Sequence, residues 1–85
     1  MSLRIEVRYF ASLREALGVG EVLQVPMGTT VGALRDRLVA RGGEHARCLA
    51  RGRAVRSALD QAMADDDEPL HDRAEVAFFP PVTGG

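Results

Sequence analysis

The residues FFPPVTGG, Phe78 to Gly85, have the types and order that suit acyl chemistry in this 85-residue sequence. Two aromatic rings are followed by two prolines and then by two glycines, the second carrying the terminal carboxylate. A carboxylate is a poor electrophile, so it must be activated, for example as an acyl adenylate, before a nucleophile attacks. Glycine suits this reaction because no side chain crowds the reacting carbon. We therefore expect Gly85 to be the reactive residue.

Activation of this carboxylate leads to chemically distinct products. Capture of the carbonyl carbon by sulfur gives a thiocarboxylate, which is itself a nucleophile, whereas capture by a lysine amine of another protein gives a conjugate. All eleven basic residues are arginine, so this chain has no side-chain amine and would be only the carboxylate donor in a conjugate. The residues themselves leave both outcomes open, together with a binding domain whose tail is passive.

The two prolines predict the direction and the extended conformation of the tail that carries Gly85. Pro80 and Pro81 cannot donate hydrogen bonds to a sheet and favour polyproline II geometry, so they direct the chain away from a preceding strand. At about 3.1 Å per residue, the tail would reach on the order of 19 Å. We divide the chain into a folded domain, residues 1–79, and an extended tail, residues 80–85. The residues expected to dock into a partner are Pro80, Pro81, Val82, Thr83 and Gly84.

Periodic apolar residues predict the elements that position this tail. Residues 3–9, LRIEVRY, alternate between apolar and charged side chains, as in a half-buried strand. Further strands are expected over residues 21–25, 57–64 and 74–79, and Pro80 ends the last of them. A short helix over residues 12–17, opened by Ser12 and stopped by Gly18, would join the first two strands.

The main helix is expected over residues 31–41. Thr30 is suited to cap its N-terminus, and Gly42 and Gly43 would end it. Apolar residues recur at helical spacing along it, and Arg35 and its two charged neighbours are expected to point outward. The segment that follows is ambiguous, and a helical turn followed by either a loop or a short strand is expected.

The order strand, strand, helix, strand, strand predicts the fold. A short link favours antiparallel pairing of the first two strands, and the helix is a crossover long enough for parallel pairing. An α+β roll follows, with a mixed sheet and one main helix packed on one face. This order fits the β-grasp, or ubiquitin-like, topology.

A sheet covered on one side has a second face that needs an explanation. Phe10, Met63 and Phe79 fall out of phase with the core positions and are expected on that face. Exposed aromatic clusters on a small domain usually mark a partner surface. The alternative is that the loop around residues 47–55 folds over them.

Composition excludes several other functions. The net charge of −1 gives no general attraction to nucleic acid, and no apolar run approaches the roughly 18 residues that span a membrane. No secretory leader is evident, so we expect a cytoplasmic protein. Cys48 is expected to be a buried structural thiol. His45 and His71 lack metal-ligand spacing and are expected at the surface, and the acidic residues 65–68 are expected in a solvated turn. We expect no metal and no permanently bound cofactor.

Three segments resemble one family, the small subunits of molybdopterin synthase, which carry sulfur in molybdenum-cofactor biosynthesis. They are EVAFFPPVTGG (residues 75–85), VRYFASLREALG (residues 7–18) and PMGTTVGALRDRL (residues 26–38). The resemblance spans the chain and is weakest over residues 42–55. Asp60 departs from it, because the family commonly has asparagine there.

This resemblance implies a function and partners. An ATP-dependent activating enzyme would adenylate Gly85, and a sulfur donor would convert it to the thiocarboxylate. The tail would then enter a pocket of the large synthase subunit and give sulfur to cyclic pyranopterin monophosphate. Two small and two large subunits would form a heterotetramer, in which this chain is the non-catalytic sulfur donor. Sulfur delivery to another pathway, such as that of thiamine, and ubiquitin-like protein modification remain as alternatives.

Overall fold

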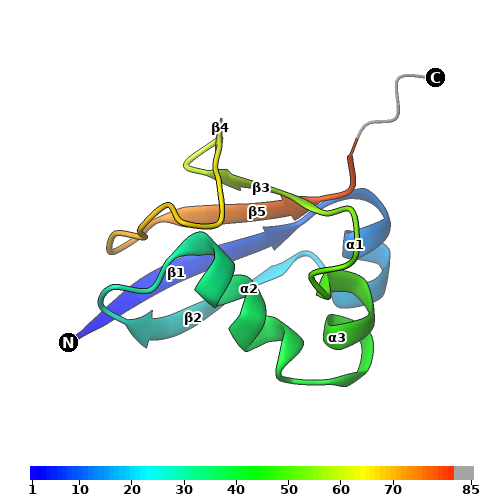
Figure 1. Ribbon diagram of the computed structural model, residues 1–85, viewed down its shortest axis with the longest axis horizontal. Coiled ribbons are helices and arrows are strands. Elements are labelled where there is room, and N and C mark those ends of the chain that lie inside the picture. Colours follow the sequence, from blue (N-terminus) through cyan, green and yellow to red (C-terminus); the bar gives the residue numbers. More distant parts are fainter. Residues whose placement is uncertain (82–85) are drawn as a thin grey trace.

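The computed structural model describes residues 1–81, which form one five-stranded mixed sheet with helices on one side (Figure 1). The strands are β1 (Ser2–Tyr9), β2 (Gly20–Pro26), β3 (Arg56–Leu59), β4 (Ala62–Met63) and β5 (Glu75–Phe79). Their order across the sheet is β2-β1-β5-β3-β4. The expected α+β class and the antiparallel pairing of β1 with β2 are confirmed. The parallel pair joins the first and last strands, β1 and β5.

Three helices are present in the described part of the chain: α1 (Ala11–Leu17), α2 (Val31–Val39) and α3 (Gly43–Leu49). In Figure 1, α2 lies across the sheet, whereas α1 and α3 lie at the end where β5 leaves it. One main helix was expected on this face, together with a short helix between the first two strands, and both are present. The short helices cover the end of the sheet that α2 does not reach, and α3 is the helical turn that the sequence left open.

The core lies between α2 and one face of the sheet. Strand β1 alternates strictly between exposed and buried residues, so that every second side chain points to the core. Val31, Leu34 and Leu38 of α2 are fully buried against it. Phe78 of β5 is also fully buried, and its ring stacks on that of Tyr9 with the ring centroids 6.4 Å apart. Burying each such side chain stabilises the fold by roughly 1.5–3 kcal/mol.

The N-terminus of α2 is closed by a side chain and by a distant loop. The Thr30 hydroxyl accepts a hydrogen bond of 3.1 Å from the backbone N–H of Ala33, which confirms the expected cap. The other two N–H groups of the first turn, those of Val31 and Gly32, donate to backbone carbonyls of the segment between β4 and β5. A Cβ on Gly32 would lie 2.9 Å from the Cβ of Asp66, so this close approach requires glycine.

Two helix boundaries differ from the expectation. Helix α2 ends at Val39, and Gly42 and Gly43, with φ of 76° and 55°, begin α3 instead of ending α2. Helix α1 begins at Ala11 without a side-chain cap, so the expected role of Ser12 is wrong. Gly18, with φ of 93°, ends α1 as expected.

Residues 57–64 were expected to be one strand, but they form the hairpin of β3 and β4. Asp60 and Gln61 turn the chain with φ of 49° and 71°, values typical of a tight hairpin turn. The Asp60 carboxylate supports this turn because it accepts a hydrogen bond of 2.9 Å from the backbone N–H of Glu75. A short polar side chain that bonds locally tolerates the left-handed conformation better than an apolar one.

Candidate functional site

Strand β5 positions the start of the tail. It lies in the middle of the sheet, between the parallel β1 and the antiparallel β3, and its last residue is Phe79. The backbone N–H of Phe10 donates to the carbonyl of Phe78 over 3.1 Å, which ties the start of α1 to the end of β5. Pro80 and Pro81 follow outside the strand and are half-buried. The predicted tail residues Val82, Thr83, Gly84 and Gly85 lie outside the described residues.

Pro80 borders a hollow of about 400 Å³ on the helix side of the molecule. Its walls come from α1, α3 and the loop between α3 and β3, and include Leu13, Cys48 and Val55. Cys48 is buried, as expected for a structural thiol. The loop after α3 therefore lies beside the start of the tail, and its conformation shapes the surroundings of Pro80.

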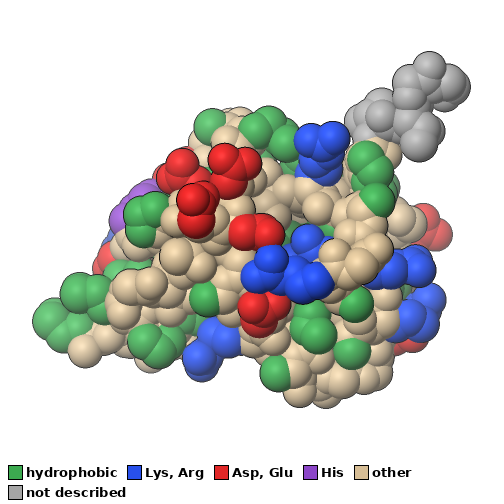
Figure 2. Space-filling model, in the orientation of Figure 1, with side chains coloured by type: hydrophobic (Ala, Val, Ile, Leu, Met, Phe, Trp, Pro, Cys, Tyr) green, Lys and Arg blue, Asp and Glu red, His purple; other side chains and the backbone are tan. Residues whose placement is uncertain are grey.

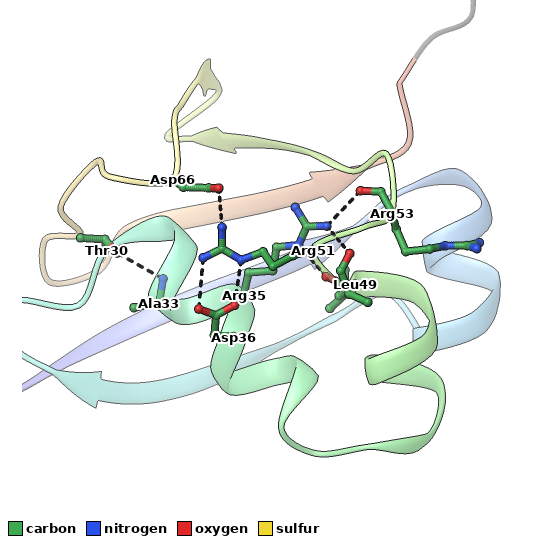
Figure 3. A network of polar contacts seen from close by, with 9 residues as sticks. Thr30, Ala33, Arg35, Asp36, Leu49, Arg51, Arg53 and Asp66 are labelled. Atoms are coloured by element: carbon green, nitrogen blue, oxygen red, sulfur yellow. Dashed lines mark hydrogen bonds and ion pairs between the residues drawn. The ribbon is translucent and has the colours of Figure 1, made fainter.

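This loop is held by Arg35, which was wrongly expected to point outward. Only 5% of Arg35 is exposed, and its guanidinium donates to three backbone carbonyls (Figure 3). The acceptors are Leu49, Ala50 and Arg53, at 2.6, 2.7 and 3.1 Å. Burial lowers the pKa of this guanidinium. The helical spacing of residues 31, 34, 35 and 38 places all four on one face, so the sequence carried a signal for its burial.

A second arginine fastens the same loop from outside. Arg51 donates to Asp36 of α2 over 2.8 Å and to Asp66 over 2.6 Å (Figure 3). Its hydrogen bonds lower the pKa of Asp36. In Figure 2, acidic side chains gather over the segment between β4 and β5, with basic side chains next to them. The acidic turn is exposed, as expected, but Asp66 is part of an ion pair that joins it to the loop.

The face of the sheet opposite the helices carries the predicted partner residues. Phe10 and Phe79 both line a hollow of about 560 Å³. Ala77 also lines it, from β5, the strand between β1 and β3. Phe10 is 42% exposed, and Phe79 is half-buried. We call this region, bordered by Arg8, Phe10, Gln61, Glu75, Ala77 and Phe79, the open face.

Met63 lies on the same side of the sheet but apart from the two rings. It pairs with Ala58, which in turn pairs with Ala77, so one row of small side chains separates Met63 from the open face. Met63 is 62% exposed and borders a different hollow, beside β3. The alternative cover, the loop around residues 47–55, borders Pro80 instead of the two rings.

Charged residues line one edge of the open face. The Arg8 guanidinium lies 3.4 Å from the carboxylate of Glu75 and 3.9 Å from that of Glu6. An apolar centre with a charged rim is the usual composition of a protein-binding surface. The geometry therefore supports docking of a partner next to the root of the tail.

The two histidines differ in their surroundings. His45 was expected at the surface, but it is half-buried, with its ring edge-on to Tyr9 and its Nε2 3.6 Å from Glu21. The Tyr9 hydroxyl donates to Glu21 over 3.0 Å, and burial raises the pKa of Tyr9. Burial alone would raise the pKa of Glu21, but hydrogen bonds from Arg41 and Tyr9 hold it below its usual value. The predicted exposure is confirmed for His71.

His71 contacts the turn between β3 and β4. Its Nε2 lies within hydrogen-bond distance of the Asp60 carboxylate, and its Nδ1 lies 2.9 Å from the carbonyl of Asp72. The contact with Asp60 raises the pKa of His71. Hydrogen bonds from the Glu75 N–H and from His71 lower the pKa of Asp60. Asp60, at which the sequence departs from the resemblance noted above, is thus part of an ion pair with His71.

Within residues 1–81, no three His, Cys, Asp or Glu side chains come together in a way that could hold a metal ion. None of the helices described here combines the length and the apolar composition needed to cross a membrane.

The sequence of the chain is similar to one protein family and to several of its known members. Residues 7–85 match the model of the ThiS family. The chain is 41% identical over 81 residues to the molybdopterin synthase sulfur carrier subunit of Escherichia coli K12, covering 95% of this chain and 99% of that one. It is 35% identical over 85 residues to the sulfur carrier subunit of Mycobacterium tuberculosis, with 98% and 99% covered.

Solved structures agree with this relationship. The putative molybdopterin converting factor subunit 1 of Pyrococcus furiosus superposes with a TM-score of 0.81 and 28% identity, covering 95% of this chain and 100% of that one. A chain of the complex between subunits 1 and 2 of the molybdopterin-converting factor of Helicobacter pylori gives 0.63 and 26%, with 98% and 100% covered. The ubiquitin of Caldiarchaeum subterraneum, 18% identical, gives a TM-score of 0.66 with both chains fully covered, which confirms the β-grasp fold.

Proposed function

Because the chain belongs to the ThiS family, and to its molybdopterin synthase sulfur carrier subunits, we propose that it carries sulfur on the terminal carboxyl of Gly85. The observation that supports this most directly is that the family match extends through residue 85 and so includes the whole tail. The fold contributes a central strand that ends at Phe79, immediately before the tail. Pro80 and Pro81 then direct the chain out of the sheet.

The proposed chemistry has two activation steps. A carboxylate oxygen of Gly85 attacks the α-phosphorus of ATP in an activating enzyme, which releases pyrophosphate and forms the acyl adenylate. Sulfide released by the sulfur donor then attacks the carbonyl carbon and expels AMP, leaving a thiocarboxylate. ATP is consumed by the activating enzyme and is not a resident cofactor of this chain.

The thiocarboxylate then acts as the sulfur donor for molybdenum-cofactor biosynthesis. Its sulfur displaces an oxygen substituent from a carbon of cyclic pyranopterin monophosphate, so that a C–S bond forms as a C–O bond breaks. Water then cleaves the resulting thioester, which restores the Gly85 carboxylate and leaves the sulfur on the pterin. We assign the groups that promote these steps to the large subunit, so that this chain is a substrate-like subunit and not an enzyme by itself. We place this reaction in the cytoplasm.

The partner in this step is the large synthase subunit. A chain of the Helicobacter pylori complex of subunits 1 and 2, to which this chain is similar, supports such an assembly. We propose that the open face docks on the large subunit through Phe10 and Phe79, with Met63 at the edge of the contact. The tail residues Pro80 to Gly84 would then enter its pocket, in a heterotetramer of two small and two large subunits.

Mass spectrometry tests the carrier role directly. The full chain, incubated with the cognate activating enzyme, ATP and a sulfur donor, should gain about 16 Da, because one oxygen is replaced by sulfur. Deletion of Gly85 should abolish the gain without loss of folding, since terminal residues contribute little to stability. Thiol-resistant conjugates larger than the chain would instead identify a protein modifier. An unchanged mass would identify a passive tail.

The docking role needs its own variant. Phe79→Ala should weaken binding to the large subunit by roughly tenfold or more, as expected for truncation of an aromatic side chain central to an interface. Met27→Ala is the matched control, because Met27 is also an exposed apolar residue but lies in the turn after β2. Equal binding of the two variants would exclude the open face as the docking surface.

A further inference from the structure

Strand β2 forms one edge of the sheet, and half of its backbone groups face away from β1. The backbone N–H of Tyr9 donates to the carbonyl of Val19 over 3.0 Å at one end of the pair, and that of Met27 donates to the carbonyl of Met1 over 3.1 Å at the other. Antiparallel pairs alternate between hydrogen-bonded and non-bonded positions, so these two bonds determine which residues of β2 are hydrogen-bonded to β1. The residues whose N–H and C=O groups then point outward from the sheet are Gly20, Val22 and Gln24.

A groove follows this edge on the helix side. Leu23 and Leu38 lie in a hollow of about 350 Å³ between β2 and α2, with Arg37 and Arg41 on its rim. A second hollow, of about 510 Å³, adjoins it and shares Arg37 and Gln24. The groove therefore extends along the strand toward Pro26, beside the outward-facing backbone groups.

The charged side chains that border the two hollows are both arginines. None of the described residues that border the two hollows is acidic, and two are arginines. Arg41 is paired with Glu21, whereas Arg37 is exposed and makes no ion pair within residues 1–81. An unpaired guanidinium beside an apolar floor favours an acidic partner over a basic one.

A second copy of the chain fits this edge less well. Antiparallel pairing of two β2 strands would continue the sheet and place both α2 helices on the same side of it. The Arg37 side chains of the two copies would then lie on the same side of one continuous sheet, and Glu21, the acidic residue of β2, is already paired with Arg41. Like charges at an interface disfavour association.

We propose that β2 and the groove bind an extended acidic segment of a partner protein by strand addition. The segment would pair with the backbone of Gly20, Val22 and Gln24, place alternate aliphatic side chains over Leu23, and bring a carboxylate to Arg37. The site is at the opposite edge of the sheet from β4 and on the opposite side from the open face. The carrier could therefore hold this partner and a partner on the open face at the same time.

Nuclear magnetic resonance with a defined peptide tests this proposal. The probe is acetyl-Asp-Asp-Val-Thr-Val-Thr-Val-Asp-Asp-amide, added to the ¹⁵N-labelled full chain, and the control probe has lysine in place of each aspartate. The acidic peptide should shift the amide signals of Gly20, Val22 and Gln24, and the signals of Phe10 and Phe79 should not move. The lysine peptide should bind at least about tenfold more weakly.

Two variants separate the backbone contribution from the charge. Val22→Pro removes an outward N–H without breaking the ladder to β1, because proline is tolerated on edge strands where its nitrogen faces solvent. Arg37→Glu reverses the charge on an exposed helix position, and Arg14→Glu is its matched control on α1. We expect each of the first two variants to weaken binding by roughly fivefold or more, and the control to bind normally.

Other results would overturn the proposal. These are no shift at millimolar peptide, equal binding of both peptides, or shifts confined to the open face. A concentration-dependent dimer in sedimentation, abolished by Val22→Pro, would assign the edge to a second copy of the chain. Should Val22→Pro fail to fold, the comparison of Arg37→Glu with Arg14→Glu still decides the question.

Discussion

The two faces of the sheet are built from the same strands but differ in burial. Phe78 and Phe79 are neighbours in β5, yet Phe78 is fully buried under the helices and Phe79 lies on the open face. Successive side chains of a strand point to opposite faces, so one position separates a residue that stabilises the fold from one available to a partner. Substitutions on the open face should therefore affect binding while leaving the scaffold folded.

The same contrast applies to the arginines. Arg35 is buried on the helix side and bonds only to backbone carbonyls, whereas Arg8 on the open face is partly exposed and bonds to carboxylates. The first organises a loop beside Pro80, and the second forms part of a surface. Hydrogen bonds in the protein interior are costly to lose, and exposed ion pairs contribute little to stability.

The largest expected effect is on stability, and it comes from truncating one of the two neighbouring phenylalanines in β5. Phe78→Ala should lower the free energy of unfolding by about 3–5 kcal/mol, because it leaves a cavity in the core. Phe79→Ala should lower it by less than about 1 kcal/mol, since its side chain is only partly buried. Urea denaturation measures both values. Similar losses in the two variants would contradict the division of the sheet into a stabilising face and a binding face.

Loss of the buried guanidinium is expected to have the next largest effect. Arg35→Ala leaves the carbonyls of Leu49, Ala50 and Arg53 without their donor and should cost about 2–3 kcal/mol in unfolding free energy. Hydrogen exchange should also accelerate in the loop beside Pro80. Arg37→Ala, two positions along the same helix but exposed, should change stability by less than about 0.5 kcal/mol. Equal effects would show that the loop is held by other contacts.

A smaller effect is expected at the start of α2. Thr30→Ala removes the acceptor of the Ala33 N–H and should cost about 1 kcal/mol, measured as a shift in the urea midpoint. Thr30→Ser keeps the hydroxyl and should retain most of the stability. A serine variant as unstable as the alanine variant would mean that the methyl group of Thr30, and not the cap, is responsible.

The smallest effect is a pH dependence at the turn between β3 and β4. The lowered pKa of Asp60 means that its contribution to stability is present above the unfolded value of about 3.9 and is lost as the pH falls through the folded value. The raised pKa of His71 means that its contribution is present below about 6.5 and is lost as the pH rises through the folded value. The pair should thus contribute most between about pH 4 and pH 6.5.

Titration of the His71 ring signals by nuclear magnetic resonance measures this coupling. In Asp60→Asn, which keeps the size of the side chain, the pKa of His71 should fall toward its ordinary value, because the carboxylate charge is gone. An unchanged pKa of His71 in that variant would show that the two side chains do not interact in solution.

The sequence was sufficient where the signal is local. Strict alternation in β1, the cap at Thr30 and the proline after β5 each predicted an element or a boundary that the structure confirms. The alternation also assigned Phe79 to the face opposite the core. These features depend on the geometry of a few consecutive residues.

The contacts between distant segments were decided only by the tertiary structure. Arg35 has a polar side chain, and only the three carbonyls of the loop beyond α3 make its burial favourable. The turn at Asp60 depends on a backbone N–H fifteen residues away, in β5. The groove along β2 exists because α2 packs above a strand with no neighbour on its outer side. Residue types and spacing determine which face a side chain takes, but its partners are set only when the segments pack together.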